Sequence, residues 1–441
     1  MATAVRQRDR IDQALSAAPE RPTIFARSTG TLPSAIAIIR VSGPRAARAL
    51  EVMTCQPLPR PRYAVVRKLF DNAGALLDTA LVLWMPGPST ATGEDLVELH
   101  LHGGRAVVAG VEAALASLEG LEPAEAGAFT RRAFENGRID LSQVEGLADL
   151  LVAETARQRV AALAMSEGGL RRAVEGWQVR LLDLCARVEA SIDHDDEDDV
   201  VSGPIDADAA ALIFDMTAVL ASPPAERLRD GVRVAVAGPP NAGKSSLINV
   251  LAGRDAAIVS PVAGTTRDII EIPVIVGDLP MVLTDTAGLR SDSDDPVEQI
   301  GIGRARGAIT RCDVLVWLGQ DSPPVAPCVL TVSAKCDIDA PHPADHVVSV
   351  VTGEGITALR AAIIEAAAEQ LPVVGSLSLS LSQRTLLIET IAALRHLAGQ
   401  TDDLLHAEWL RLARQQLNRI TGAAGTEEML DRLFGRFCIG K

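Results

Sequence analysis

The sequence predicts a multidomain α/β protein in which one α/β domain interrupts a helical domain. Three observations lead to this prediction. Short strand and helix patterns alternate up to about residue 135. Long amphipathic helical patterns follow, and patterns of the same kind return near the end of the chain. Between these helices, β and α segments alternate from Gly231 to about residue 370. The simplest architecture is a helical domain split by an insertion whose two connections lie close together.

The expected boundaries follow these changes of pattern. They are a disordered tail over 1–21, an α+β domain over 22–136, a first helical part over 137–230, an inserted α/β domain over 231–371 and a second helical part over 372–441.

Composition excludes several classes of protein. The 441 residues are 48% hydrophobic, which is enough for several cores, and the formal net charge is −15. That charge argues against binding of nucleic acid through the whole surface, although it leaves room for a local basic patch. We expect no transmembrane span and no secretory signal, because no long uncharged apolar run occurs. The six scattered cysteines contain no C-x-x-C pair, which favours a reducing cytoplasm over a zinc ribbon or a disulfide framework.

The first domain should contain three buried strands, because apolar and β-branched residues gather in three short runs. These runs are 34–43, 80–88 and 95–104. A helix with Pro44 in its first turn should follow the first strand, and a second helix should span 105–119. His100 and His102 lie two positions apart and so on one face of a strand. They could form a metal pair, or they could be packed or hydrogen-bonded residues.

The first helical part repeats apolar residues every three or four positions over 141–165 and 171–193. The acidic run HDDEDD at 194–199 follows it. This run leaves two interpretations open, a solvated loop between helices or carboxylate ligands of a metal ion.

The inserted domain opens with a phosphate-binding loop. GVRVAVAG (231–238) predicts a strand, and GPPNAGKS (238–245) follows with the spacing G-x-x-x-x-G-K-S ahead of a helix. In this context backbone N–H groups cradle phosphates at a helix N-terminus. Lys244 supplies a positive charge at the β- and γ-phosphates, and Ser245 offers a hydroxyl group to Mg²⁺.

Two further motifs indicate a GTPase rather than a general ATPase. AGTTRDIIE (263–271) contains Thr266, which can close over Mg²⁺ only when a γ-phosphate is present and so forms a switch. VLTDTAGLR (282–290) ends a strand in D-x-x-G. Its Asp285 should hold Mg²⁺ through water, and the Gly288 N–H should sense the γ-phosphate.

The base-recognition motif departs from the usual N-K-x-D. The candidate is AKCD, in which Asp337 can read guanine but Ala334 stands where Asn braces the loop. SVVTGEG (349–355) supplies the last loop, with Ser349 and Val350 near the base. We expect GTP as the nucleotide, bound by a loop with a weaker brace.

Hydrolysis needs a group other than the usual glutamine. Leu289 follows D-x-x-G where Ras-type enzymes place a water-orienting Gln. Asn241 in the phosphate loop can reach the β- and γ-phosphates, and IVSPVAGTT (258–266) could wrap carbonyl groups around a monovalent cation there. Such a cation would neutralise the charge that develops in the transition state.

Together these segments resemble the MnmE (TrmE) family, bacterial tRNA uridine modification GTPases of the TrmE-Era-EngA-like P-loop group. The segments that carry the resemblance are GPPNAGKSSLIN, AAIVSPVAGTTRDIIE, DTAGLR, VEQIGIGRA, TIFARSTG, WMPGPSTATGEDLVELHLHGG, FTRRAFENGRIDLSQVEGLADL and the terminal FCIGK. The resemblance covers nearly the whole chain, from about residue 22 to 441.

The resemblance implies a tetrahydrofolate-binding N-terminal domain that also forms a homodimer, a helical domain, and a Ras-like, K⁺-dependent G domain inserted into it. It implies a cytoplasmic GTPase, a hydrolase acting on acid anhydrides, with no membrane partner. With the flavoprotein MnmG (GidA), in a heterotetramer, the family adds an aminomethyl or carboxymethylaminomethyl group at C5 of the wobble uridine of certain tRNAs. The implied cofactors are GTP, Mg²⁺, K⁺ and 5-formyl- or 5,10-methylene-tetrahydrofolate.

The resemblance and the motifs together give four groups of site residues. The GTP contacts are Asn241, Ala242, Gly243, Lys244, Ser245, Ser246, Ser260, Thr265, Thr266, Asp285, Thr286, Ala287, Gly288, Lys335, Asp337, Ser349 and Val350. The Mg²⁺ ligands are Ser245 and Thr266, and the K⁺ ligands are Asn241, Ser260, Val262 and Thr265. The catalytic residues are Asn241 and Glu298, of which the glutamate acts on the attacking water. The folate contacts are Arg40, Glu98, Arg138 and Lys441.

Two other functions compete with this expectation. One is a GTP-gated ribosome-assembly factor without modification activity, for which the folate contacts would be superfluous. The other is a non-enzymatic, folate-binding scaffold, which the retained Lys244, Asp285 and Glu298 argue against.

The chain ends in FCIGK, for which we expect a docked tail at the folate site. A prenylation box is a poor match, because Gly440 is not aliphatic. Phe437 and Ile439 should be buried, Gly440 should allow a close backbone approach, and Lys441 should reach the folate. Cys438 is either a small buried hydrophobic residue or a thiol with a part in the modification chemistry.

Overall fold

The computed structural model describes residues 21–193, 205–253, 257–258, 271–286, 307–400, 402–422, 427–435, 437 and 439–440. The chain divides into two compact units. Unit 1 comprises Met1–Val144 and Ala424–Lys441, and unit 2 comprises Glu145–Ala423. The acidic run at 194–199 lies outside the described residues, so both interpretations of it stay open.

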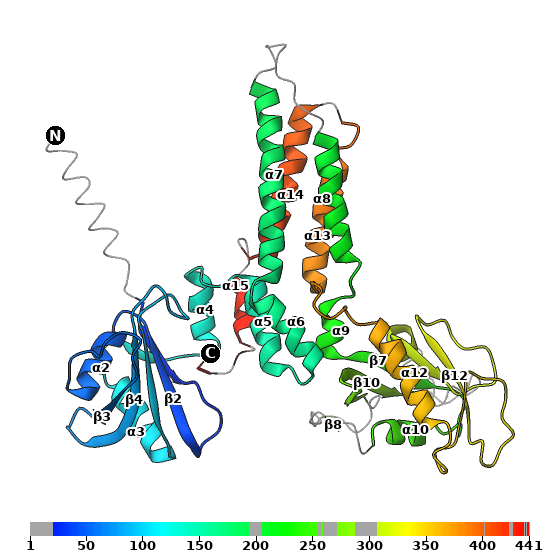
Figure 1. Cartoon of the computed structure of the whole chain (residues 1–441), viewed down its shortest axis with the longest axis horizontal. Coiled ribbons are helices and arrows are strands. Elements are labelled where there is room, and N and C mark those ends of the chain that lie inside the picture. Colours follow the sequence, from blue (N-terminus) through cyan, green and yellow to red (C-terminus); the bar gives the residue numbers. More distant parts are fainter. Residues whose placement is uncertain are drawn as a thin grey trace, which may run out of the picture. The chain divides into compact units, whose positions relative to one another are not determined.

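Unit 1 is built on a six-stranded sheet with the order β3-β4-β5-β2-β1-β6. Its strands are β1 Thr23–Arg27, β2 Ser34–Ser42, β3 Val65–Phe70, β4 Leu76–Met85, β5 Leu96–Gly103 and β6 Leu121–Pro123. Its helices are α2 Ala46–Thr54, α3 Arg105–Ala116, α4 Ala128–Glu135 and α15 Glu427–Phe434. Strand β3 is therefore one edge of the sheet (Figure 1).

The two faces of this sheet have different roles, because successive side chains of a strand point to opposite sides. Ile39 and Leu99 are at most 1% exposed and share one core with residues of α2 and α3. Arg40 and Glu98 alternate with them, so their side chains lie on the other face. The two residues are also direct cross-strand partners in the β2–β5 ladder.

The three predicted strands are present as β2, β4 and β5, and the two predicted helices as α2 and α3. Pro44 is a correction: α2 begins at Ala46 with Arg45 as its N-cap, so the proline precedes the helix instead of lying in its first turn. Strands β1, β3 and β6 were not predicted. Strand β3 carries Arg67 and Lys68 in its middle, and its pairing with β4 overrides this polar pattern.

His100 and His102 are hydrogen-bonded residues. His102 Nδ1 lies 2.8 Å from Asp78 Oδ1, and His100 Nε2 lies 3.3 Å from Glu98 Oε2. Within the described part of the chain, no group of three or more His, Cys, Asp and Glu side chains is placed to hold a metal ion.

Unit 2 contains a seven-stranded sheet with the order β13-β12-β11-β7-β10-β9-β8. Its strands are β7 Val232–Ala237, β8 Ala257–Ile258, β9 Glu271–Val276, β10 Leu279–Asp285, β11 Val314–Trp317, β12 Val329–Ala334 and β13 His346–Val348. Helices α10 Lys244–Leu251 and α12 Ile356–Glu369 pack with it. Strand β7 pairs in parallel with β10 and β11. Parallel sheets of this kind bind ligands beyond the carboxyl ends of their strands, where the strand order reverses.

The helices of unit 2 precede and follow this sheet along the chain. They are α6 Ala156–Ser166, α7 Gly169–Asp193, α8 Ile205–Leu220, α9 Ala225–Asp230, α13 Leu381–Arg395 and α14 Asp403–Ile420; α5, Leu141–Val152, spans the division between the units. Helices α7, α8, α13 and α14 lie side by side and share one core (Figure 1).

The connections into and out of the sheet domain meet. The Ala225 N–H donates to the Leu379 carbonyl at 3.0 Å, and the Leu381 N–H donates to Glu226 Oε1 at 2.8 Å. This proximity is what an inserted domain requires. None of the helices in the described ranges combines the length and the apolar character needed to cross a bilayer.

Candidate functional site

The phosphate loop joins the end of β7 to the start of α10 and has an unusual backbone. Gly238, Asn241 and Gly243 have φ angles of 152°, 61° and 95°. Glycine adopts such angles freely, and asparagine tolerates them better than most residues. A Cβ atom at Gly238 would lie 3.0 Å from Leu318 Cβ, so this position also needs glycine for space. The loop leads directly into the N-terminus of α10, where an anion is stabilised.

Lys244 is folded back over this loop. Its side chain is 7% exposed, and its Nζ donates to the carbonyl oxygens of Gly238 at 3.2 Å and Pro239 at 2.8 Å. Burial lowers the pKa of the ammonium group, and the nearby Asp285 carboxylate opposes this change only in part. A bound polyphosphate would favour the charged form, because it brings negative charge to the loop.

Ser245 and Asp285 have the features of a Mg²⁺ site. The Ser245 hydroxyl donates to Asp285 Oδ2 at 2.6 Å. Asp285 Oδ1 is buried, and it accepts no hydrogen bond from any described residue. An unsatisfied buried carboxylate oxygen is costly, and a hard divalent cation with oxygen ligands would satisfy it. The donor set therefore fits Mg²⁺, with the hydroxyl as a ligand and the carboxylate within reach of its water shell.

The base-recognition loop reaches the phosphate loop through Lys335. This residue follows β12 with a φ of 62°, and its Cε lies 3.9 Å from the position of a Cβ on Gly243. Its aliphatic stem therefore passes over the phosphate loop. Asp337, two residues after Lys335, is exposed, so its carboxylate is accessible to a bound base.

Ala334, at the position of the usual Asn brace, packs against the hydrophobic core of the sheet. A backbone hydrogen bond from the Cys336 N–H to the Val348 carbonyl, 3.3 Å long, ties the loop to the end of β13 instead. Ser349 follows directly and is fully buried, and its Oγ accepts from the N–H groups of Val351 and Thr352 at 3.2 Å. The two loops expected around the base are thus held together by their backbones.

The predicted nucleotide residues that the structure describes lie on the phosphate loop and the start of α10, at the end of β10, and in the segments that follow β12 and β13. These are Asn241, Ala242, Gly243, Lys244, Ser245, Ser246, Asp285, Thr286, Lys335, Asp337, Ser349 and Val350. The Thr286 hydroxyl also donates to the Val236 carbonyl at 2.9 Å, which joins β10 to β7 beside the phosphate loop. The remaining predicted residues of the nucleotide and cation sites lie outside the described residues: Ser260, Val262, Thr265, Thr266, Ala287, Gly288 and Glu298.

In unit 1, Arg40 and Glu98 form an ion pair on the face of the sheet away from its main core. Arg40 Nη2 lies 2.9 Å and Nε 3.2 Å from Glu98 Oε1, and His100 faces Glu98 Oε2. The Arg40 guanidinium also lies 5.8 Å from the ring centroid of Phe129 in α4. Arg138 is exposed, and its Cγ lies 3.2 Å from the position of a Cβ on Gly93.

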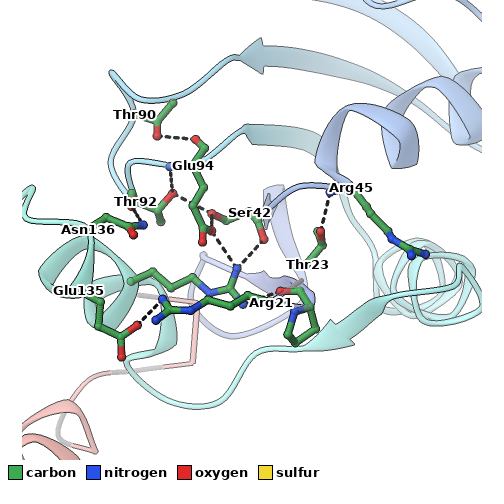
Figure 2. A network of polar contacts seen from close by, with 11 residues as sticks. Arg21, Thr23, Ser42, Arg45, Thr90, Thr92, Glu94, Glu135 and Asn136 are labelled. Carbon is green, nitrogen blue, oxygen red and sulfur yellow. Dashed lines mark hydrogen bonds and ion pairs between the residues drawn. The ribbon is translucent and has the colours of Figure 1, made fainter. Parts of the chain in front are cut away.

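A buried polar network, which the sequence did not predict, holds the loop that carries Gly93. The side chain of Arg132 bonds Glu94 Oε2 at 2.8 Å, the Ser42 carbonyl at 3.1 Å and the Pro22 carbonyl at 2.6 Å. Figure 2 shows how Ser42, Thr92 and Glu94 point toward one another around this centre. The Ser42 hydroxyl lies 2.9 Å from Glu94 Oε2 and 2.7 Å from the Thr92 hydroxyl.

The same network reaches the segment that leads to Arg138. Asn136 Nδ2 donates to the Thr92 carbonyl at 2.7 Å (Figure 2). These contacts hold the end of α4 against the loop before β5. They therefore fix the backbone that leads to Arg138. The signal in the sequence was the polar run STATGED (89–95), which had no periodicity to interpret.

The C-terminal tail is docked on unit 1, as predicted. Phe437 is 3% exposed and lies 6.5 Å from Phe434, measured between ring centroids. Gly440 has a φ of 94°, and the Ser28 hydroxyl donates to its carbonyl at 2.8 Å. A Cβ on Gly440 would lie 2.1 Å from the Arg27 carbonyl oxygen, so the close backbone approach does require glycine.

Ile439 is a correction. Its side chain is 64% exposed rather than buried, because its backbone pairs with Ala126 and turns the side chain outward. The expectations for Cys438 and Lys441 fall on positions outside the described residues.

Two family models and many known proteins are similar to this chain. The family model "GTP-binding protein TrmE N-terminus" matches residues 23–138, and the model "MnmE helical domain" matches residues 141–438. The chain is 53% identical to the tRNA modification GTPase MnmE of Rhizorhabdus wittichii, over 95% of this chain and 96% of the relative. It is 51% identical to the protein of the same name from Sphingopyxis alaskensis, over 91% of this chain and 100% of the relative. Among solved structures, the G domain of the T. maritima FeoB iron transporter shares 25% identity, covers 31% of this chain and 98% of its own, and gives a TM-score of 0.24.

Proposed function

This chain belongs to the MnmE family of tRNA modification GTPases, and from that premise we propose the chemistry in which it takes part. It binds GTP and is a GTPase involved in tRNA modification. We propose that its hydrolysis depends on K⁺ and that it works as a homodimer with the flavoprotein MnmG. Together they add an aminomethyl or carboxymethylaminomethyl group at C5 of the wobble uridine of certain tRNAs, with the carbon taken from a tetrahydrofolate.

The observation that carries this proposal is the docked tail of unit 1. Gly440 lies against Arg27 and Ser28 at the end of β1, and in the neighbouring strand Arg40 pairs with Ala26 of β1. The last residue, Lys441, therefore follows a segment held close to the Arg40–Glu98 pair. A tail fixed there can add a cation to the proposed folate site.

The Arg40–Glu98 pair suits a reduced folate. The pterin ring presents an N–H group and an amino group side by side, and the glutamate tail of a folate is anionic. Glu98 can accept about four hydrogen bonds, of which Arg40 takes two and His100 one. The remaining acceptor site would take one of these two pterin groups, and the cations Arg40, Arg138 and Lys441 would face the anionic tail. When bound, the folate supplies the one-carbon unit.

In the G domain, each described residue has a physical role toward GTP and its cations. Lys244 would neutralise phosphate charge, and Ser245 and Asp285 would hold Mg²⁺, which would supply polarisation of the phosphate oxygens. Asn241, at the tip of the phosphate loop, would face K⁺ together with Ser260, Val262 and Thr265. Glu298 would orient the attacking water.

The test is mass spectrometry of tRNA nucleosides from a strain that lacks this gene. We expect the modified wobble uridine to be absent and to return with the wild-type gene, but not with Glu98→Gln. A normal nucleoside profile together with accumulated ribosomal precursors would instead support the alternative function, a GTP-gated ribosome-assembly factor.

A further inference from the structure

We propose that the β3 edge of unit 1 is a surface that binds the tRNA backbone. The β3 edge is defined as Arg60, Arg62, Tyr63, Arg67 and Lys68, on strand β3 and the loop before it (Figure 1). The inference rests on the proposed action on tRNA wobble uridine and adds the place where the RNA would be held.

The first observation is local charge. Residues 56–70, QPLPRPRYAVVRKLF, contain four cationic residues and no Asp or Glu, in a chain whose formal net charge is −15. A local reversal of sign of this kind attracts a polyanion, and the acidic remainder of the surface repels it. RNA would therefore be directed to this segment.

The second observation is that these charges are available. Arg60, Arg62 and Lys68 are exposed. Arg67 is half-buried and alternates with Val65 and Leu69 on the face that packs against α2, whereas Lys68 lies on the other face, so the two side chains flank the edge of the sheet. None of the four forms an ion pair with a described residue, whereas Arg40, Arg131 and Arg132 of the same unit all do. Cations left without a carboxylate partner can pair with phosphate groups at little cost.

The acidic groups near this edge are already occupied. Asp71, which directly follows β3, accepts hydrogen bonds from the N–H groups of Ala73 and Ala75 at 2.9 and 2.8 Å. Glu51 of α2, the helix that packs beside β3, faces Arg48 at 3.9 Å. Asp71 keeps its negative charge, and Asp78 of β4, the cross-strand partner of Leu69, is held by His102. None of these three carboxylates forms an ion pair with the four cations of the β3 edge.

The third observation is an exposed aromatic ring among these cations. Tyr63 is the single tyrosine of the chain and is 50% exposed. The guanidinium of Arg60 lies 4.0 Å from its ring centroid. Proteins hold unpaired RNA bases by stacking them on aromatic rings and on the planes of arginine side chains. Tyr63 and Arg60 form such a platform, which an acidic protein partner would not need.

The loop that carries this platform is held in place. The Arg62 N–H donates to the Trp84 carbonyl at 2.8 Å, and the Arg62 side chain donates to the Ser89 carbonyl. Ser89 begins the loop that Thr90, Thr92 and Glu94 anchor to the buried network (Figure 2). The surface therefore loses little conformational entropy on binding.

Protection of a sheet edge explains only part of this arrangement. Charged residues on an edge strand prevent pairing with another chain, which would account for Arg67 and Lys68. Arg60, Arg62 and Tyr63 precede the strand and expose no strand edge, so they need another explanation. Binding of RNA accounts for all five residues.

The test measures binding of the full-length protein to a fluorescent, unmodified tRNA transcript with a wobble uridine, at several KCl concentrations. For Arg67→Gln with Lys68→Gln we expect affinity to fall about tenfold or more. We also expect the slope of log affinity against log salt to become shallower by about one to two, because each lost phosphate contact removes about 0.7–0.9. The matched control is Arg159→Gln with Arg395→Gln, which removes the same charge from exposed positions on α6 and α13 and should leave the slope unchanged.

Variants of Tyr63 distinguish the contribution of base stacking to tRNA binding from that of charge. Tyr63→Ala should weaken binding by about 5- to 100-fold without a change in salt slope, because stacking on an aromatic ring is not ionic. Tyr63→Phe should bind as the wild type does. Thermal unfolding and circular dichroism would show that each variant is folded.

The inference is overturned if the Arg67 and Lys68 variant matches the wild type in affinity and slope, or if it behaves as the control does. If wild-type protein binds no tRNA while the nucleoside profile still depends on the gene, the β3 edge fails and the proposed modification stands. If the nucleoside profile does not depend on the gene but tRNA binding still requires the β3 edge, the proposed function fails and the surface stands.

Discussion

Replacing Gly440 by alanine should release the end of the C-terminal tail from unit 1. A Cβ at this position would lie 2.1 Å from the Arg27 carbonyl oxygen and 2.9 Å from Ser28 Cα. Both are backbone atoms, so no side-chain rotation can relieve the clash. The φ of 94° is also unfavourable for alanine, at a cost of about 1–2 kcal/mol.

The hydrogen bond from the Ser28 hydroxyl to the Gly440 carbonyl, worth about 0.5–1.5 kcal/mol, favours docking in both proteins and so does not enter the difference between them. The backbone strain alone lowers the ratio of docked to released tail about 5- to 30-fold, and the clash lowers it further. Phe437 stays buried, so the release should be confined to the last residues.

Two measurements follow the release. A carboxypeptidase should trim Gly440→Ala back to Phe437 faster than it trims the wild-type protein. The apparent Kd for 5-formyl-tetrahydrofolate should rise by up to the same factor as the docking ratio falls, because only the docked fraction is competent to bind.

The matched control is Gly399→Ala. Gly399 has a φ of 75°, but no heavy atom lies within 4 Å of its added Cβ, so this variant carries the backbone strain without the clash. It should trim and bind folate as the wild type does. Faster trimming of Gly440→Ala with unchanged folate affinity would refute the link between tail and folate. Unchanged trimming would refute the docking argument itself.

Three other predictions concern the nucleotide site. GTP hydrolysis should need K⁺ and fail with Na⁺, and Asn241→Ala should remove this response while GTP still binds; equal turnover in both salts contradicts the cation role. Glu298→Ala should lower kcat by about 10²-fold or more with little change in GTP affinity, as for a group that acts on the water in the transition state; an unchanged kcat excludes that role. Ala334→Asn should tighten GDP binding, measured by calorimetry, about two- to tenfold, because the added side chain braces the loop. An unchanged affinity would show that the backbone bond from Cys336 to Val348 already braces it. A fourth prediction concerns pH. Burial raises the pKa of Asp78, but hydrogen bonds from His102 more than offset this, so the pKa lies below its ordinary value. The pair therefore stabilises unit 1 above about pH 4, and this contribution is lost as pH falls through the lowered pKa. In Asp78→Asn, the free energy of unfolding, measured with urea, should fall less steeply at acid pH than in the wild type. An unchanged pH dependence would contradict the stabilising role of the Asp78–His102 pair.

The fold class, the phosphate loop and the close approach of the tail backbone could be predicted from the sequence. Long amphipathic helices and alternating β and α segments are local patterns, and a pattern of this kind is decided by residues a few positions apart. The G-x-x-x-x-G-K-S spacing works in the same way, because one short turn sets the backbone that meets phosphate. The same holds for Gly440, because a glycine at this position indicated that the backbone of the tail closely approaches another part of the protein.

Features that depend on residues far apart in the chain could not be predicted and became visible in the folded protein. Ile439 follows the same apolar pattern as Phe437, yet its backbone pairing with Ala126 turns it to solvent. Arg132 and Glu94 lie 38 residues apart and had no periodicity to connect them.

Strand β3 and its basic residues show most clearly why local sequence patterns do not determine every element. Arg67 and Lys68 interrupt the apolar pattern of a segment for which no strand was predicted, and pairing with β4 makes it a strand at the edge of the sheet. Local patterns report the preference of a short segment, whereas the free energy of folding is the sum over all contacts. Where the two disagree, the long-range contacts prevail. Here they placed the single tyrosine and four cations, none in an ion pair with a described residue, along one edge of the sheet.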